Sequence, residues 1–209
     1  MERRITMRKR RLKRERRKRQ ILKVSMRLFS QKGFRGARTR NIARAAGISE
    51  AMVFKRFKNK RDLYNTVIRD RMEKHSHVFL RAEDYEKASD KTGFLMKALL
   101  SFVDSFEKDQ AFIRMLFYGA LEDRKFARVF SENYLPDRIK ELEDLIRLVL
   151  KDGGYRDIDH RILVTFAIYM LAGHLVMQSV PGMKKLNPFD RDEFKNAAED
   201  IILNGLKKR

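Results

Sequence analysis

Large apolar side chains recur every three or four residues along most of this chain, which is the spacing of an amphipathic α-helix. The pattern begins at Ile21, Val24 and Leu28 and continues almost to the last residue. No segment alternates apolar and polar side chains in the way that a half-buried β-strand does. The sequence therefore predicts an all-α protein.

Glycines and capping residues divide this pattern into separate helices. Gly33 and Gly47 end the first two, because glycine readily takes the left-handed conformation that closes a helix. Ser49 begins the third as its N-cap, and Asn59 with Asp62 has the spacing of a capping box before the fourth. The sequence predicts helices over residues 20–31, 39–46, 49–57, 60–80, 92–108, 110–121, 125–133, 136–151, 162–180 and 190–206.

Two short predicted helices and a tight turn lie between Arg38 and Leu63. This is the helix-turn-helix plan, whose second helix enters the major groove of DNA. Val53 and Phe57 are four residues apart on that second helix and are expected to face the core. Small and branched side chains that would let the two helices pack closely are Ala43, Ala46, Ala51, Ile42, Ile48 and Val53.

The net charge of +21 belongs to one end of the chain. Residues 1–61 carry 24 Lys and Arg against three Asp and Glu, whereas residues 62–209 carry 25 of each kind. Such an asymmetry is typical of a nucleic-acid-binding end joined to a neutral domain. The segment with the helix-turn-helix pattern is thus also the segment that attracts phosphates.

The first 19 residues contain twelve Lys and Arg and only four large apolar residues. No helix face here can be buried, so the sequence predicts a mobile arm that becomes helical on DNA and tracks phosphates or enters the minor groove. The alternative is a solubilising basic tail. A role at a membrane surface would need a wide apolar face, which the arm lacks.

The run from Ile21 to Tyr64 resembles the DNA-binding domain of TetR-family transcriptional regulators. The resemblance is strong over residues 16–76, and the remaining two thirds of the chain match that family only in length and helical layout. The matching positions are Ile21, Leu22, Leu28, Phe29, Gly33, Phe34, Thr39, Arg40, Ile42, Ala43, Ala46, Gly47, Ile48, Ser49, Phe54, Phe57, Lys60 and Leu63.

The resemblance implies three parts: a basic arm (1–15), a three-helix helix-turn-helix DNA-binding domain (16–76) and a larger helical ligand-binding and dimerisation domain (77–209). Two departures from the family pattern bear on DNA contact. Arg38 stands where the family usually has a hydroxyl residue, so a hydroxyl cap or phosphate contact is missing there, although Arg38 could replace it with a charged contact. Phe54 stands where many members have a tyrosine that reaches phosphate, and it is expected to pack instead.

The predicted recognition helix leaves its remaining side chains for solvent or DNA. Lys55 and Arg56 are candidates for guanine edges or phosphate, and Met52 would offer an apolar contact to a thymine methyl. Glu50 would accept from cytosine or complement the helix dipole. Flanking basic residues are expected to bind phosphate, the alternative being solvated surface. The full predicted DNA-binding set is Arg38, Thr39, Arg40, Ser49, Glu50, Ala51, Met52, Lys55, Arg56, Lys58 and Lys60.

The second domain follows a charged, poorly periodic connection after Leu80 and is rich in aromatic residues. Aromatic residues at helical spacing are more often core than pocket lining. The resemblance, rather than the pattern, implies a small-molecule pocket between these helices. The candidate lining residues are Phe102, Phe106, Phe117, Tyr118, Phe130, Phe166 and Tyr169.

Residues 162–180 contain no Asp, Glu, Lys or Arg, which by length alone is compatible with a membrane span. Polar residues dilute the run, and a single span would tether the basic module to a membrane. We expect instead a helix buried on nearly all sides, with one face in its own domain and another against a second subunit. The family resemblance implies a homodimer formed by the last two long helices.

Catalytic and metal-binding motifs are not evident. The four histidines, His75, His77, His160 and His174, have no spacing that suggests a ligand set, and there is no cysteine. No phosphate-cradling glycine loop or nucleophile motif is present. We therefore expect no enzyme, no cofactor and no metal. The absence of cysteine and of a signal-peptide pattern favours the cytoplasm.

These observations lead to one leading hypothesis and two alternatives. The chain is expected to be a homodimeric repressor that a small apolar or amphipathic ligand releases from a palindromic double-stranded operator. The first alternative is a non-specific architectural DNA-binding protein driven by the basic arm. The second is an enzymatic or ligand-binding helical domain that its basic end places on nucleic acid.

Overall fold

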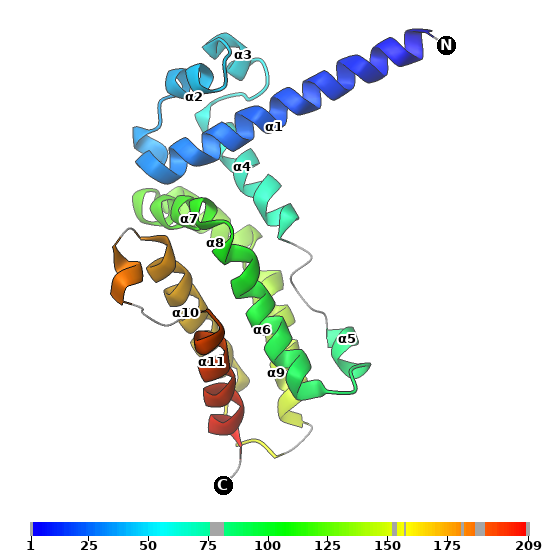
Figure 1. Cartoon of the computed structure of the whole chain (residues 1–209), viewed down its shortest axis with the longest axis vertical. Helices are drawn as coiled ribbons and strands as arrows, with labels where there is room; N and C mark the ends of the chain where they lie inside the picture. Colours follow the sequence, from blue (N-terminus) through cyan, green and yellow to red (C-terminus); the bar gives the residue numbers. More distant parts are fainter. Residues whose placement is uncertain are drawn as a thin grey trace. The chain divides into compact units, whose positions relative to one another are not determined.

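The computed structural model describes residues 2–75, 82–151, 154–156, 158–180, 182–186 and 191–207 (Figure 1). The regular structure of these residues is helical, apart from one isolated antiparallel bridge between Tyr155 and Lys207. This confirms the all-α prediction. His77 and Asp190, which the sequence placed in helices, lie outside the described residues.

The helices begin and end close to the predicted positions after residue 38. They are α1 (Glu2–Gly36), α2 (Thr39–Ala45), α3 (Glu50–Phe54), α4 (Lys60–Lys74), α5 (Ala82–Glu86), α6 (Lys91–Glu107), α7 (Gln110–Glu122), α8 (Arg124–Asn133), α9 (Pro136–Lys151), α10 (His160–Ser179) and α11 (Arg191–Leu206), with a 3₁₀ turn at Met183–Leu186. The chain forms two compact units. The first consists of Met1–Lys74 with Arg114–Arg124, and the second of His75–Ile113 with Lys125–Arg209.

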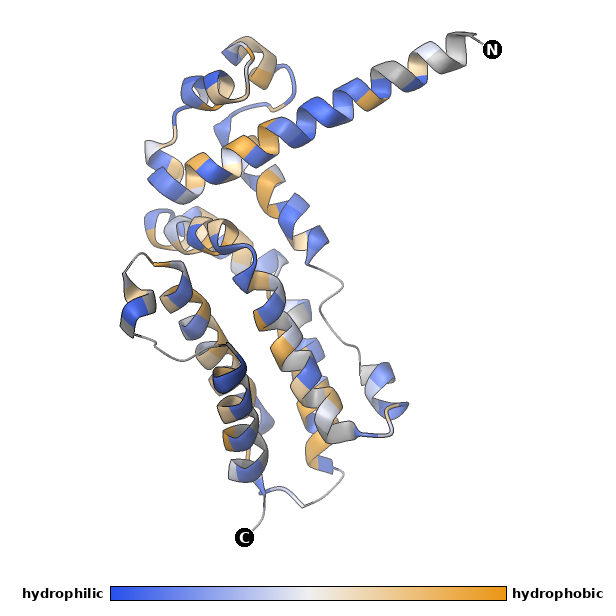
Figure 2. Cartoon of the chain, in the orientation of Figure 1, coloured by the Kyte–Doolittle hydropathy of each residue, from blue (hydrophilic) through white to orange (hydrophobic). Residues whose placement is uncertain are grey.

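Helix α1 differs most from the sequence prediction. It is helical from Glu2 onward, so the expectation of a mobile arm over the first 19 residues is wrong for this structure. Arg, Lys, Leu, Met and Glu all have high helix propensities, and a helix that is already nucleated at its buried end extends at little cost. Residues 2–19 form the outer half of α1, and Figure 2 shows mainly hydrophilic colouring over residues 11–19. Gly33 interrupts the helix near its end with φ 66° and ψ 179°, as the sequence predicts.

Helices α1 and α4 pack against each other through aromatic side chains. The ring of Tyr64 meets those of Phe29 and Phe34 edge to face, with centroid distances of 4.9 and 5.2 Å. Tyr64 is 1% exposed, and its hydroxyl donates to the carbonyl oxygen of Met115 at 2.8 Å. Burial raises the pKa of this hydroxyl far above its usual range, so it stays protonated and remains a donor.

The acidic end of α7 is held to the same unit by charged contacts. Glu122 Oε2 accepts the backbone N–H of Phe34 at 2.9 Å and that of Arg35 at 3.4 Å. The neighbouring Asp123 pairs with the guanidinium of Arg61. These contacts explain why residues 114–124 group with the amino-terminal helices although the sequence places them in the second domain.

The second unit contains an apolar core of buried residues from α5, α6, α9 and α10. Helix α5 contributes Tyr85, which is 2% exposed, although the sequence indicated only a charged connection there. One buried aromatic residue in five is too weak a signal for a helix. The buried members of this core are Tyr85, Met96, Val103, Leu145, Ile146, Val149, Val164, Ala167 and Leu171.

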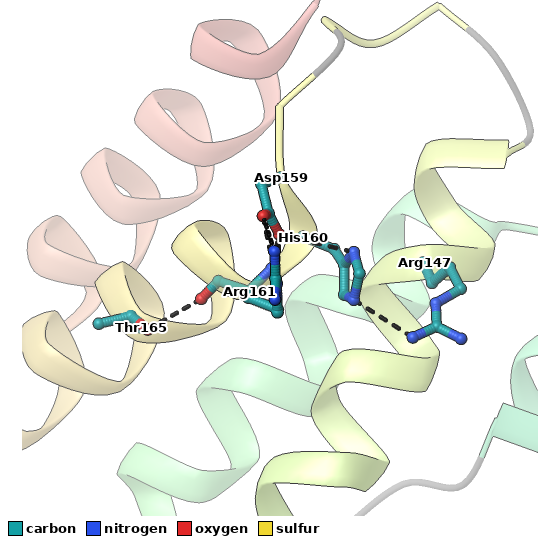
Figure 3. Close-up of polar contacts among 5 residues, drawn as sticks. All are labelled: Arg147, Asp159, His160, Arg161 and Thr165. Atoms are coloured by element: carbon teal, nitrogen blue, oxygen red, sulfur yellow. Dashed lines mark hydrogen bonds and ion pairs between the residues drawn. The ribbon is translucent and has the colours of Figure 1, made fainter.

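The start of α10 is marked by a polar network (Figure 3). Asp159 is the N-cap and accepts the backbone N–H of Arg161 at 2.9 Å, while the Arg161 side chain donates to both oxygens of the same carboxylate. These hydrogen bonds lower the pKa of Asp159 to about 2. His160 Nε2 accepts from Arg147 at 3.2 Å, which ties α10 to α9.

Gly33 and Gly47 provide a matched test of the contact between Gly33 and Glu122. Both have positive φ, but a β-carbon at Gly33 would collide with the Glu122 carboxylate, whereas one at Gly47 would meet nothing. We expect Gly47→Ala to cost about 1–2 kcal/mol, the strain of left-handed backbone. Gly33→Ala should cost roughly 1–3 kcal/mol more, because it also disrupts charged hydrogen bonds. Urea denaturation measures both.

Glu122→Ala supplies the control for this comparison. In the Glu122→Ala background the collision is absent, so the difference in cost between the two glycine substitutions should become smaller, and what remains reflects the Gly33 backbone at φ 66° and ψ 179°. If Gly33→Ala and Gly47→Ala cost the same in the unaltered protein, the Glu122 contact does not stabilise this turn.

Candidate nucleic-acid interface

Helices α2 and α3 form a tight helix-turn-helix. Gly47 takes the left-handed conformation with φ 62°, and its N–H donates to the carbonyl of Arg44 at 3.0 Å. The next residue, Ile48, donates to Ala43 across the same turn at 3.0 Å. The turn thus satisfies the last carbonyls of α2 and sets the direction of α3.

Side-chain caps hold the first turn of α3. Ser49 is its N-cap and accepts the backbone N–H of Met52 at 3.3 Å, as predicted. Glu50 accepts a short hydrogen bond from the hydroxyl of Thr39, which joins the starts of the two helices. Thr39 and Glu50, both predicted to contact DNA, are therefore engaged with each other. Arg38 is the N-cap of α2, and its side chain makes no capping hydrogen bond, as expected for an arginine in place of a hydroxyl residue.

The inner face of α3 is the one that the sequence predicts. Val53 is fully buried and Phe57 is 3% exposed. Helix α3 ends at Phe54, and hydrogen bonds of helical type carry the backbone on to Phe57. On the same core lie α2 residues Ile42 and Ala43.

The outer face of α3 exposes Ala51, Met52, Phe54 and Lys55. Two expectations are wrong here. Phe54 does not pack in the core but is 45% exposed, because it lies about 100° around the helix from the buried Val53. Ala51 does not lie between the two closely packed helices but faces solvent. Met52 is 41% exposed, so the face available to bases is more apolar than expected.

The flanking basic residues differ in how they are held. Arg38, Arg40 and Lys58 are exposed. Lys60 instead lies 4.5 Å from the centre of the Phe34 ring and donates to the carbonyl of Arg35 at 3.4 Å. Burial, and then repulsion from Arg61, lowers the pKa of Lys60. Lys60 thus supports the fold at the start of α4.

A groove with basic walls, which the sequence did not indicate, lies between the outer half of α1 and α3. It has a volume of about 790 Å³ and is lined by Arg11, Arg14 and Lys18 of α1 and by Lys55 and Arg56, which follow α3. Arg56 Nη1 donates to the carbonyl of Arg14 at 3.3 Å. Residues 11, 14 and 18 are spaced so that they share one face of a helix, and this spacing could have indicated a basic wall. The prediction of a mobile arm left it unused.

The predicted pocket residues do not share one environment. Phe106 is 3% exposed and stacks on His75 with centroids 4.3 Å apart. Phe166 and Tyr169 are 69% and 70% exposed on α10. Phe117 and Tyr118 belong to the first unit, Phe130 is half-buried on α8, and the side chain of Phe102 lies outside the description. An effector pocket built from these residues stays a prediction.

Metal ligands are not gathered in the described part of the chain, where no three His, Asp or Glu side chains could hold one ion. The described histidines have other partners. His75 contacts Ser105 and Asp109, and His174 lies 2.7 Å from Glu107 and stacks on Phe194.

Helix α10 presents two different faces. Val164, Leu171 and Leu175 are buried within the second unit, whereas large apolar side chains, Phe166 among them, are exposed on the other face. Among the described helices α10 alone is long and apolar enough to cross a membrane, with one third of its most apolar stretch buried. Core helices of soluble proteins have the same length and composition, so this is weak evidence for a span.

The amino-terminal region matches known proteins in sequence. Residues 21–67 match the family model described as bacterial regulatory proteins, tetR family. A stretch of 48 residues is 42% identical to an uncharacterized HTH-type transcriptional regulator, YvkB, of Bacillus subtilis. That alignment covers 23% of this chain and only a quarter of the relative's length.

Solved structures resemble almost the whole chain. A fatty acid metabolism regulator of Clostridium perfringens superposes with a TM-score of 0.72 at 18% identity, over 91% of this chain and all of that one. The TetR-family regulator PfmR of Thermus thermophilus superposes with a TM-score of 0.71 at 19% identity, over 90% of this chain and 96% of that one. The ketosteroid regulator KstR2 of Mycobacterium tuberculosis superposes with a TM-score of 0.69 at 19% identity, over 92% of this chain and 96% of that one. At these identities the likeness shows a shared fold.

Substitutions at Ser49 measure how much the α3 cap contributes to the stability of the protein. We expect Ser49→Ala to destabilise the protein by about 1 kcal/mol, because the N–H of Met52 loses its acceptor. Ser49→Asp should restore stability, since aspartate caps as well as serine. Thermal denaturation measures both variants. If Ser49→Ala left the stability unchanged, the cap would not hold α3.

Proposed function

We propose that this chain is a transcriptional regulator of the TetR family that binds a palindromic DNA operator as a homodimer. The observation that carries the proposal is the exposed outer face of α3 on a helix-turn-helix whose inner face is fully packed. The unit that holds this motif also carries the entire excess of positive charge. Such a combination attracts phosphates and presents a helix to the major groove.

In this proposal the exposed residues in the middle of α3 contact the bases. Met52 and Ala51 offer apolar surface to a thymine methyl. Arg38 and Arg40 at the start of α2 lie on the same motif and position the protein through phosphates. The Thr39–Glu50 hydrogen bond holds these two sets of residues in a fixed relation.

Dimerisation is supported by an apolar surface that a single chain leaves uncovered. Ile162, Phe166 and Tyr169 on α10 are 51%, 69% and 70% exposed, and Ile201 on α11 is 66% exposed. Their spacing of four and three residues places the α10 members in one stripe. A second copy that covers this stripe would turn two recognition helices toward half-sites about 34–36 Å apart.

An effector is proposed to bind within the second unit and to weaken operator binding. The chain passes from α4 into that unit at residue 75, so a shift of α4 would change the separation of the two recognition helices. The ligand acts only through its different affinity for the two states. Proteins of this fold include regulators named for fatty acids and ketosteroids, so apolar and amphipathic metabolites are the first compounds to screen.

The proposal places the protein in the cytoplasm and assigns it no catalytic role. The rival view is a non-specific DNA-binding protein whose affinity comes from the outer half of α1. The test is selection of bound duplexes from a random library near physiological salt, with the intact chain and with a chain that lacks residues 1–19. An enriched two-fold motif that survives the truncation supports the proposal. No enrichment, with binding lost on truncation, contradicts it.

Substitutions at Met52 and Arg38 should affect DNA binding in different ways. Met52→Ala should reduce discrimination at one base pair of the selected operator by about 1 kcal/mol, roughly fivefold, because it removes a base contact. Arg38→Ala should weaken all duplexes alike and reduce the slope of log affinity against log salt by about 0.9 per chain. Fluorescence anisotropy with operator and scrambled duplexes separates the two effects. A uniform loss for Met52→Ala would argue against base readout there.

The exposed stripe of α10 should determine the oligomeric state. Phe166→Glu combined with Tyr169→Glu places two charges in the proposed interface, which should yield monomers and reduce operator affinity at least about tenfold. Leu121→Glu, at a position that is 85% exposed on α7, is the matched control and should remain dimeric. Analytical ultracentrifugation measures the mass. A double variant that stays dimeric would place the interface elsewhere.

A further inference from the structure

We propose that the basic groove between the outer half of α1 and α3 is a phosphodiester site that holds one backbone strand of the bound DNA. The inference rests on the proposed DNA-binding function and adds a second contact surface to it. In this view the outer half of α1 is one wall of a clamp, and the end of α3 is the other.

Regular helical geometry of α1 builds the first wall. Arg11, Arg14 and Lys18 line the groove together with Met7, so the positions follow one another by four, three and four residues. Residues at this spacing share one face of an α-helix. In a disordered arm these cations would have no fixed relation to one another, whereas in a helix they share the face that lines the groove.

The end of α3 supplies the second wall. Lys55 and Arg56 follow the last helical residue, and Arg56 donates one of its five N–H groups to the backbone carbonyl of Arg14. This bond holds the guanidinium between the two walls and uses the main chain of α1, so it persists when the Arg14 side chain is changed. The planar donor group that results suits bidentate binding of phosphate oxygens.

The charge of the groove calls for an anion. Five cations line it against a single carboxylate, that of Glu15. Like charges gathered around one groove repel each other, and they do so more strongly where the protein excludes water. An anion between the walls would convert this repulsion into attraction. The groove is therefore better suited to a phosphate-bearing ligand than to an empty state.

The dimensions favour a nucleic-acid strand over a single small anion. Arg11 and Lys18 are seven residues apart, or about 10 Å along the helix at 1.5 Å per residue. Phosphates of one DNA strand advance about 3.4 Å along the duplex axis and are further apart along the strand itself, so this length accommodates more than one phosphate. Lys55, which lines the groove, is three residues from Met52 on the base-reading face.

This assignment changes the roles of Lys55 and Arg56. The sequence suggested them for guanine edges or phosphate, and the groove selects phosphate. Base readout then depends on the more exposed apolar part of α3, and sequence-independent affinity depends on the groove.

Two pairs of substitutions on α1 test the proposal with equal changes in charge. Arg14→Ala with Lys18→Ala removes two cations from the groove. Lys13→Ala with Arg16→Ala removes one Lys and one Arg from the opposite face of the same helix, where both side chains are exposed. Alanine favours helix in both, and circular dichroism would verify that α1 is retained.

The readout is the salt dependence of affinity for the full-length protein on the selected operator and on a scrambled duplex. The groove pair should lower the slope of log affinity against log salt by about 1.8 per chain, at roughly 0.9 for each phosphate contact, on both duplexes alike. The opposite-face pair should change it by less than half as much. Equal effects of the two pairs would overturn the proposal, because diffuse charge rather than a built site would then be responsible.

A second measurement distinguishes a DNA strand from a free anion of the same chemistry. Isothermal titration with pyrophosphate should show binding that is weaker than binding of duplex by at least about tenfold. Binding of pyrophosphate as tight as that of duplex would overturn the assignment to DNA. Failure of the proposed function appears separately, as the lack of an enriched operator, because the groove comparison still works on any duplex.

Discussion

The packing of Tyr64 against Phe29 and Phe34 is the contact on which the rest of the first unit depends. It fixes the crossing of α1 and α4, and its hydroxyl bond to Met115 brings residues 114–124 into the same unit. Helices α2 and α3 pack on this platform, and the outer half of α1 extends from it. A shift of this ring cluster would therefore move the base-reading face and one wall of the basic groove at the same time.

Concentrating so much positive charge in one unit has a structural cost that the acidic end of α7 reduces. Arg61 and Lys60 both lie over the Phe34 ring, at 4.1 and 4.5 Å from its centre, and Asp123 pairs with Arg61. Glu122 meanwhile caps the backbone at Phe34. Cations that serve the fold are thus neutralised locally, whereas those of the groove have one carboxylate among them. This difference distinguishes structural charge from charge that is available to a ligand.

Individual residues show where sequence reasoning succeeds and where it does not. Gly47 and Ser49 were correctly predicted because their effects are local: a left-handed turn and a side-chain cap depend on neighbours within a few residues. Phe54 was misjudged because its type suggests packing, while its place beside the buried Val53 turns it outward. Helix α5 was missed because only Tyr85 signals burial there.

The sequence by itself determined the helical class, the helix-turn-helix and the separation of charge, since these follow from periodicity, turn chemistry and composition. The tertiary structure alone decided that α1 begins at Glu2, that the end of α7 belongs to the first unit, and that Arg14 lies beside Arg56. The physical reason is sequence distance. Arg14 and Arg56 are 42 residues apart, and no local pattern records a contact that exists only once α1 has packed on α4.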